Sequence, residues 1–302
     1  MDHRPRILFA VFGVLVLTLV AAFGSSDLAF LGPKGSYSDE AANECASRDH
    51  ITGTLPLKTI SEIAASVRDG QAQFGLLPFE NSIAGFVPET QKLLLAASDP
   101  GWRIIGDTTI PISNNLLVKP GTKGADLKRV ISHAEALKEC AKWLKTNFPQ
   151  LTQEEVSSTA AAAEAVSKGD GTLAAIASPA AASLYQLQTL YPNIQDTRSN
   201  ATNFAVIQSA GRNFPEQNPT RLVIQIEVAS GADTLARLLD ALHSFSFNLT
   251  SADSVATGTL DSHRFALVLD SKKGADLAQI QDLLRPAGAL LVGAYHPSDL
   301  TP

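Results

Sequence analysis

Residues 74–97 read FGLLPFENSIAGFVPETQKLLLAA, and this stretch indicates the class of structure to which the chain belongs. Its first seven residues, 74–80, form an apolar run with the length of a buried strand. The remainder begins with a polar turn at Asn81 and Ser82 and continues as a helix to residue 97. Buried strands that alternate with helices are typical of α/β proteins with a mostly parallel sheet.

The same alternation runs through residues 26–209, which we expect to form one domain. Ser36 or Ser38 can cap a helix over residues 38–48, whose first turn carries Asp39 and Glu40 at the positive end of the helix dipole. We expect further strands at 27–32, twice within 103–119, at the start of 129–148 and of 173–187, and at 203–208. We expect further helices at 61–70, after a turn at 132–133, at 158–169 and at the end of 173–187.

A linker rich in Gly, Pro and Asn at 210–219 separates this domain from a second one at 220–302. The second domain has a different rhythm, with a strand at 221–228, a helix at 234–245, two strands at 249–257 and 263–270, a helix at 275–288 and a strand at 289–295. The order βαββαβ predicts a compact ferredoxin-like unit.

The N-terminus differs from both domains. Arg4 and Arg6 precede the almost wholly apolar residues 7–23, and small residues follow. This pattern predicts a secretory signal peptide over residues 1–25 and export to the periplasm, or an uncleaved segment that tethers the protein to a membrane. A start codon assigned upstream of the true one would instead leave the protein in the cytoplasm.

Composition excludes several classes of function. The 302 residues carry 24 Lys and Arg against 30 Asp and Glu, a formal charge of −6 without a basic run, so nucleic acid is not an expected partner. Two cysteines far apart, Cys45 and Cys140, make no disulfide framework. Neither metal-ligand spacing nor the glycine fingerprint of dinucleotide binding is present in the sequence, and we expect no cofactor.

Polar residues gather where predicted strands give way to helices. These positions present backbone N–H groups and hydroxyls at one edge of an open α/β sheet, where ligands bind. Each residue could equally serve as a helix cap or turn residue, but several together favour a cleft for a small polar or anionic ligand. The residues are Ser36, Asn81, Ser82, His133, Ser158 and Thr159.

Five segments of the first domain, in this order, resemble the motifs of the prephenate dehydratase family: FLGPKGSYSDEAA (30–42), LLPFENSIAG (76–85), SHAEALKECAKWL (132–144), STAAAAEAV (158–166) and NATNFAVI (200–207). The second domain resembles the family's ACT regulatory domain, with GADTLARLL (231–239) and GAYHP (293–297) near its motifs. The resemblance is collinear from residue 27 to about residue 297.

The resemblance implies a bilobal domain like type 2 periplasmic binding proteins, followed by an ACT domain. It implies a monofunctional enzyme that converts prephenate to phenylpyruvate without a metal or organic cofactor. Thr202 matches the family's catalytic threonine, and the six polar residues above, together with Asn203, would bind the substrate. Phenylalanine could act at the ACT domain through Gly231, Ala232, Leu235 and Asn248, and a homodimer or homotetramer is expected.

Three positions depart from the family pattern. The arginine of its Thr-Arg-Phe motif is Asn203, with Arg198 upstream as the nearest replacement, and its Pro-Gln after His133 is Ala134-Glu135. The ACT motif Glu-Ser-Arg-Pro reads DSVA at 253–256, which puts phenylalanine inhibition in question. Two alternatives therefore stay open: an arogenate dehydratase, and a binding protein whose catalysis is impaired by Asn203.

Overall fold

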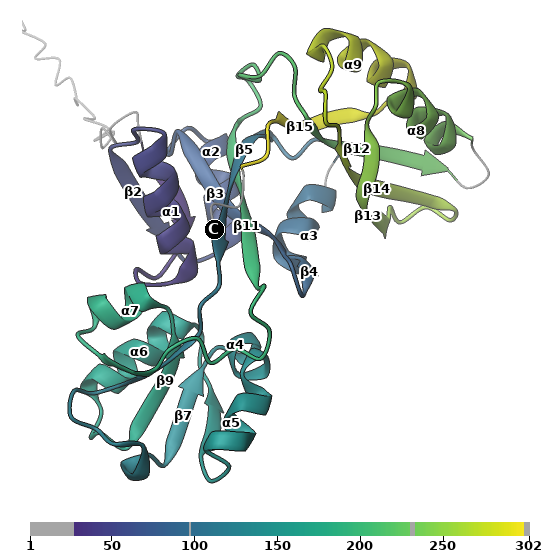
Figure 1. The fold of residues 1–302 in the computed structure, drawn as a ribbon. Coiled ribbons are helices and arrows are strands. Elements are labelled where there is room, and N and C mark those ends of the chain that lie inside the picture. Colours follow the sequence, from purple (N-terminus) through teal and green to yellow (C-terminus); the bar gives the residue numbers. More distant parts are fainter. Residues whose placement is uncertain (1–26, 97, 230–232, 299–302) are drawn as a thin grey trace, which may run out of the picture.

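Figure 1 shows the computed structural model, which describes residues 27–96, 98–229 and 233–298. The predicted signal or anchor segment, residues 1–25, and the predicted effector residues Gly231 and Ala232 lie outside these ranges. Within them, no helix has both the length and the apolar character that a membrane span requires. The chain forms two α/β lobes and a smaller C-terminal domain beside the first lobe.

The sheet of the first lobe has five strands in the order β2-β1-β3-β11-β5, and a sixth, two-residue strand, β4, pairs with β3. Strands β1, β2 and β3 are parallel, whereas β11 is antiparallel to both of its neighbours, β3 and β5. The elements are β1 (Asp27–Leu31), α1 (Tyr37–Arg48), β2 (Gly53–Leu57), α2 (Ile60–Arg68), β3 (Phe74–Asn81), β4 (Gly85–Phe86), α3 (Pro88–Ala96), β5 (Trp102–Pro111) and β11 (Ala201–Ser209).

Strand β1 explains why helices cover both faces of this sheet. Its residues alternate between the faces, so Leu28 and Phe30 pack towards α1 while Ala29 joins the core under α2. Full burial of an apolar side chain as large as Leu or Phe contributes about 1.5–3 kcal/mol. The helix that follows β1 begins where the sequence predicts, because Ser36 Oγ accepts a hydrogen bond from Asp39 N at 3.3 Å.

The second lobe is a five-stranded sheet in the order β10-β6-β9-β7-β8. Strand β7 is parallel to β8 and β9, and β6 is antiparallel to β9 and β10. The elements are β6 (Asn115–Val118), η1 (Gly124–Asp126), β7 (Arg129–Ser132), α4 (Ala134–Glu139), α5 (Ala141–Asn147), β8 (Thr152–Glu155), α6 (Thr159–Lys168), β9 (Leu173–Ala177), α7 (Pro179–Leu184) and β10 (Gln188–Tyr191).

The prediction of a mostly parallel sheet is correct for β2-β1-β3 in the first lobe and for β9-β7-β8 in the second, and it is wrong for the strands that connect the lobes. The chain passes from β5 to β6 and returns from β10 to β11, and each of these four strands has an antiparallel partner. Strands β2, β8 and β10 were not expected from the sequence. Strand β2 contains Pro56, and all four residues of β8 are exposed, so neither has the apolar pattern of a strand.

The predicted single helix after His133 is two helices, α4 and α5, which meet at Cys140. The interruption lets Asp196, from the segment that returns to the first lobe, cap the second helix. Its carboxylate accepts hydrogen bonds from Lys142 N and Trp143 N, each at 2.9 Å, and its own N–H donates to Glu139 O at 2.8 Å. The connection between the lobes is thereby attached to the helix pair.

The C-terminal domain has the predicted ferredoxin-like order βαββαβ: β12 (Arg221–Ala229), α8 (Thr234–Ser244), β13 (Asn248–Ala256), β14 (Ser262–Asp270), α9 (Leu277–Leu284), η2 (Arg285–Ala287) and β15 (Leu290–Tyr295). Its sheet, β13-β14-β12-β15, joins that of the first lobe because β15 pairs with β5 at Gly293 and Ile104. A Cβ atom at Gly293 would lie 3.1 Å from Ile104 Cβ and 3.0 Å from Val223 Cβ, so glycine permits this close approach.

Candidate active site

Thr202, the predicted catalytic residue, lies at the start of β11, opposite Asn81 at the end of β3. Asn81 Nδ2 is 3.1 Å from Thr202 Oγ1. The Oδ1 atom of Asn81 accepts hydrogen bonds from Ile83 N and Ala84 N, each at 2.9 Å, which fixes the orientation of the amide. Thr202 Oγ1 therefore accepts from Asn81, and its own proton is free to point towards another acceptor.

Asn81 also connects Thr202 to a chain of buried amides. Asn81 Nδ2 is 2.7 Å from Asn200 Oδ1, and Asn200 Nδ2 donates to Glu139 Oε1 at 2.7 Å. Asn114 Nδ2 donates to the other carboxylate oxygen, also at 2.7 Å. Asn114 and Asn200, at 0% and 2% exposure, lie in the two segments that connect the lobes, and Glu139 belongs to the second lobe. The Glu139 carboxylate thus accepts hydrogen bonds from both segments that connect the lobes.

Two titratable residues, Glu139 and Tyr37, contact these amides, and burial is the main influence on the pKa of each. It raises the pKa of Glu139, against the opposing effect of the hydrogen bonds from Asn114 and Asn200. Tyr37 donates to Asn114 Oδ1 at 2.9 Å, and burial, followed by the nearby Glu139 charge, raises the pKa of its hydroxyl. The tyrosine therefore stays a neutral donor, which fixes Asn114 in the orientation that Glu139 requires.

Ser82 lies in the same place as Asn81 and Thr202. Its hydroxyl donates to Ser199 O at 3.1 Å and accepts from Ala201 N at 3.0 Å, so it fastens the turn after β3 to the start of β11. The structure thus brings three of the predicted residues, Asn81, Ser82 and Thr202, into one hydrogen-bonded group.

The other predicted polar residues lie at separate helix N-termini. Ser36 caps α1, and Ser158 caps α6 by accepting from Ala161 N at 3.0 Å. Thr159 is the first residue of α6 and is 8% exposed. His133 is exposed and caps α4, with Nδ1 accepting from Glu135 N at 3.4 Å. Each of these helix starts offers N–H groups to an anion, but no hydrogen bond joins these four residues to one another within the described ranges.

Asn203 is not part of the group around Thr202. Its Nδ2 donates to Asp107 Oδ2 at 2.9 Å and to Thr109 Oγ1 at 2.8 Å, both on β5. The cation that the family pattern places at this position would therefore face Asp107 rather than Thr202. Arg198 is exposed and forms no ion pair with another described residue.

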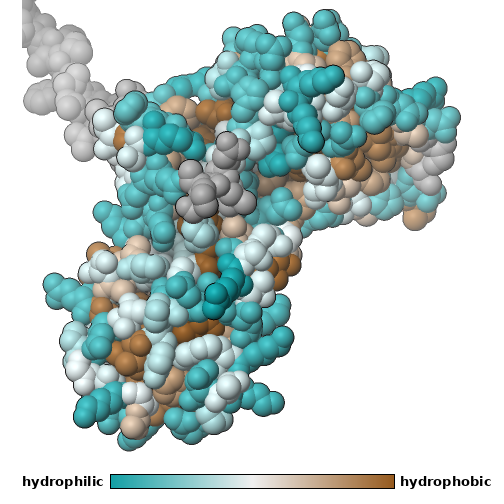
Figure 2. Space-filling model, in the orientation of Figure 1, coloured by the Kyte–Doolittle hydropathy of each residue, from teal (hydrophilic) through white to brown (hydrophobic). Residues whose placement is uncertain are grey.

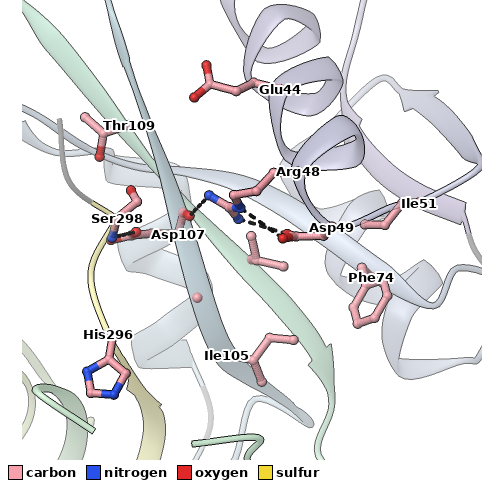
Figure 3. A pocket seen from close by; sticks show the side chains of 12 residues that line it. Glu44, Arg48, Asp49, Ile51, Phe74, Ile105, Asp107, Thr109, His296 and Ser298 are labelled. Atoms are coloured by element: carbon pink, nitrogen blue, oxygen red, sulfur yellow. Dashed lines mark hydrogen bonds and ion pairs between the residues drawn. The ribbon is translucent and has the colours of Figure 1, made fainter. Parts of the chain in front are cut away.

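Two cavities adjoin these residues. One, of about 630 Å³, is bordered by Asp107 and Thr109 and by Ser298 beyond β15, and neither Thr202 nor Asn81 lines it (Figure 3). The other, of about 270 Å³, is bordered by Glu139 and Asn200 as well as by Ile83, Ala84, Glu135, Lys138, Lys142, Gln195, Asp196 and Thr197. The smaller cavity is the one next to the Thr202 group.

Sequence reasoning missed Tyr37, Asn114, Glu139 and Asn200 as members of the site. Asn114 and Asn200 share one signal in the sequence: each is a polar residue directly before a strand. Both are almost fully buried in the structure. Buried amides are retained where their hydrogen bonds are satisfied, which here requires partners far away in the sequence. That requirement is invisible in the sequence alone.

Two α/β lobes with two connections between them, a hydroxyl presented beside those connections and a ferredoxin-like domain at the C-terminus define a bilobal enzyme domain with an appended domain. Residues 28–212 match the family model of prephenate dehydratase, and the chain belongs to that family. The prephenate dehydratase of Bacillus subtilis is 29% identical over 90% of this chain and 99% of its own length.

Two solved structures are similar over nearly the whole chain. The prephenate dehydratase of Arthrobacter aurescens in complex with L-Phe has a TM-score of 0.78 and 25% identity, covering 91% of this chain and 93% of its own. GqqA, described as a novel type of quorum-quenching acylase, has a TM-score of 0.76 and 28% identity, covering 90% of this chain and 98% of its own. The chain spans 60% of the length of the bifunctional chorismate mutase/prephenate dehydratase of Pseudomonas aeruginosa, with which it is 33% identical over 75% of this chain.

Proposed function

We propose that this protein converts prephenate to phenylpyruvate, with Thr202 as the proton donor. The observation that carries the proposal is the hydrogen bond from Asn81 Nδ2 to Thr202 Oγ1, because it leaves the Thr202 proton available to a ligand. In the reaction the bond to the ring carboxylate breaks and carbon dioxide leaves. The freed electron pair enters the ring, the C–O bond to the ring hydroxyl breaks, and hydroxide takes a proton to leave as water.

The driving force comes from the substrate, since the ring becomes aromatic. The protein's contribution is to orient a dianion and to protonate the departing oxygen. Thr202 would give its proton to that oxygen and recover one from solvent, so that one proton is consumed in each turnover. The N–H groups at the starts of α1, α4 and α6 are the donors that we expect to bind the two carboxylates.

Steady-state kinetics of the purified full-length chain with prephenate test this proposal. We expect phenylpyruvate to form, and we expect Thr202→Val, which keeps the shape of the side chain but removes the hydroxyl, to lower kcat by about 10²–10⁴-fold. Thr202→Ser should retain most of the activity. Absence of turnover by the unmodified protein at any pH from mildly acidic to mildly alkaline would reject the proposal. Parallel assays with arogenate separate the two dehydratase reactions.

The GqqA structure, described as an acylase, matches over 90% of this chain, but the described residues do not favour that activity here. Amide hydrolysis of that kind needs an activated nucleophile or a bound water with a base. Both cysteines are buried, and burial raises the pKa of Cys45 to about 11 and raises that of Cys140 as well. Thr202 accepts a hydrogen bond from an amide, which does not activate it. We therefore expect the protein to have no acylase activity.

For the C-terminal domain we propose an ACT-type role, with phenylalanine as effector and a homodimer or homotetramer as the assembly. The solved relative with bound L-Phe supports the ligand. Leu235 packs against the domain core and Asn248 is exposed at the start of β13, the edge strand of the sheet. Apolar residues gather on this domain in Figure 2, and Leu249 and Val255 of β13 are 44% and 37% exposed. Light scattering and calorimetry with phenylalanine test both points.

We infer from the apolar residues 7–23 that the protein is exported or membrane-tethered. Fractionation of cells, together with mass spectrometry of the N-terminus, tests this inference. A mature N-terminus near Ser25 in the periplasmic fraction supports cleavage, and an intact segment in the membrane fraction supports a tether. A cytosolic protein that starts near Asp27 contradicts both.

A further inference from the structure

One buried carboxylate contacts both the C-terminal domain and the strand that carries Thr202. Asp107, in the middle of β5, is 2% exposed. Its Oδ1 accepts from Ser298 N at 2.5 Å, and its Oδ2 accepts from Asn203 Nδ2 at 2.9 Å and lies 3.8 Å from Arg221 Nη1. Figure 3 shows the Ser298 contact together with the bond from Arg48 to the Asp107 carbonyl oxygen.

These partners come from different parts of the molecule. Arg221 begins β12 and Ser298 follows β15, so both belong to the C-terminal domain. Asn203 is the direct neighbour of Thr202 in β11. A carboxylate that is almost fully buried is costly unless it is paired and hydrogen-bonded, so its donors are not interchangeable with water. Asp107 consequently requires the C-terminal domain to be seated in order to be satisfied.

Strand β11 depends on this contact because its pairing with β3 is irregular beside Thr202. The register shifts between Asn203 and Phe204, where the partner of Phe204 is Pro78, which has no N–H to donate. On the other side, the Asn203 amide binds β5 through Asp107 and Thr109. The side chain of Asn203 therefore compensates for the weakened ladder at the point where the position of Thr202 is set.

We propose that Asp107 is a positioning residue for Thr202, and that it makes the placement of Thr202 depend on the seating of the segment that follows β15. The proposal rests on the proposed dehydratase function for its kinetic readout. It also predicts a structural readout that does not require turnover. Of the two groups of the C-terminal domain that contact Asp107, the one that forms a hydrogen bond is the backbone N–H of Ser298, and it can be removed without changing any charge.

The discriminating pair of variants is Ser298→Pro and Ser298→Ala. Proline removes the N–H that donates to Asp107, whereas alanine keeps it and removes only a hydroxyl that has no hydrogen-bond partner among the described residues. We expect Ser298→Pro to lower kcat about tenfold with KM changed less than about twofold, and Ser298→Ala to leave both unchanged. In an Asp107→Ala background, which alone should lower kcat, Ser298→Pro should have no further effect.

Hydrogen exchange provides the readout that is independent of catalysis. Ser298→Pro should increase exchange at the amides of residues 201–204, and Ser298→Ala should not. A protein that makes no phenylpyruvate but shows this difference would reject the proposed function and keep the positioning role. Equal exchange in the two variants, or equal kcat, would overturn the positioning role even in an active enzyme. Additive effects of Asp107→Ala and Ser298→Pro would overturn it as well.

A chain that ends at Tyr295 provides a second test if proline disturbs the segment more widely. It lacks Ser298 N–H but also the contacts of His296 with Thr220 and Glu216. His296→Ala in the full chain is the matched control, because it loses those contacts and keeps the donor to Asp107. We expect the shortened chain to reproduce the exchange pattern of Ser298→Pro, and His296→Ala to resemble the unmodified protein. The opposite pattern would contradict the proposal.

Discussion

Asn81 donates to Thr202 Oγ1 across a distance of 3.1 Å while its own carbonyl oxygen is occupied by Ile83 N and Ala84 N. The amide therefore has one orientation, and the direction of the bond to Thr202 follows from it. A carboxylate in the same position would reverse that bond, since it can only accept. The orientation of Asn81 is thus a testable element of catalysis.

Two replacements of Asn81 should distinguish losing the hydrogen bond to Thr202 from reversing its direction. Asn81→Asp keeps an oxygen for Ile83 N and Ala84 N but captures the Thr202 proton, and we expect kcat to fall about 10³-fold. Asn81→Ala leaves the Thr202 proton free, and we expect a smaller loss of about tenfold. Steady-state kinetics with prephenate measure both. A larger loss in the alanine variant would contradict the assigned direction of the hydrogen bond.

Glu139 should make stability depend on pH in an unusual direction. Burial raises the pKa of its carboxyl above the ordinary value of 4.5, so between the two values the folded protein binds more protons than the unfolded chain. Its contribution to the free energy of unfolding therefore decreases as the pH rises through that interval.

Urea unfolding of the unmodified protein and of Glu139→Gln, from pH 4 to pH 7, measures this effect. The glutamine variant does not titrate, so the difference in free energy of unfolding between the two proteins should change across the interval. Glu40, whose pKa is raised mainly by burial as well, is present in both proteins and cancels in the difference. Parallel curves would show that Glu139 does not titrate in this range.

Asn203→Arg restores the arginine of the family motif, and the structure predicts a modest result. The new side chain would meet Asp107 and the adjoining cavity of about 630 Å³, which has room for it. Because arginine at this position would keep a contact with Asp107 and would not face the Thr202 group, we expect kcat to change less than about threefold. A new ion pair with the buried Asp107 should raise the midpoint of thermal unfolding by a few degrees. A rise in kcat of a hundredfold would instead identify Asn203 as a catalytic defect.

Arg264 is expected to hold the C-terminal domain against α3. Its Nη1 donates to Leu95 O at 2.8 Å, next to the bond from Gln225 Nε2 to Leu94 O at 2.9 Å, so two side chains of this domain cap the carbonyl end of α3. Arg264→Ala should lower the free energy of unfolding by about 1–2 kcal/mol, measured by urea titration. Arg237 on α8 is 77% exposed with a partner at 3.7 Å, and Arg237→Ala is the control, with little expected change.

Features of the fold and of the site could be predicted from the sequence where the interacting residues are close together in the chain. Thr59 and Ser158 cap helices through bonds to residues three positions ahead, and such caps can be recognised from neighbouring residues. Asn81 was singled out by its place after a predicted strand, whereas the catalytic role of Thr202 was inferred from the family motif. Glu139 binds Asn114 and Asn200, 25 and 61 residues away, and no pattern near Glu139 announces either partner.

Asn203 shows most clearly what could not be predicted from the sequence. Its departure from the family motif is visible in the sequence, but its meaning depends on which way the side chain points. The strand alternates between two faces, and its partner on β5, Asp107, is 96 residues away. The sequence therefore reveals that a residue has changed, and the structure reveals that the change concerns the contact between strands and the C-terminal domain.

The pairing of Gly293 with Ile104 has a practical consequence for handling the protein. It places β15 against β5, so that the sheet of the first lobe does not end in a bare strand there. Cutting the chain in the linker at 210–219 would uncover the backbone N–H and C=O groups of β5 together with the apolar face of Ile104. An exposed strand edge of this kind recruits other chains. We expect the isolated catalytic portion to self-associate, and its poor solubility should not be mistaken for a failure to fold.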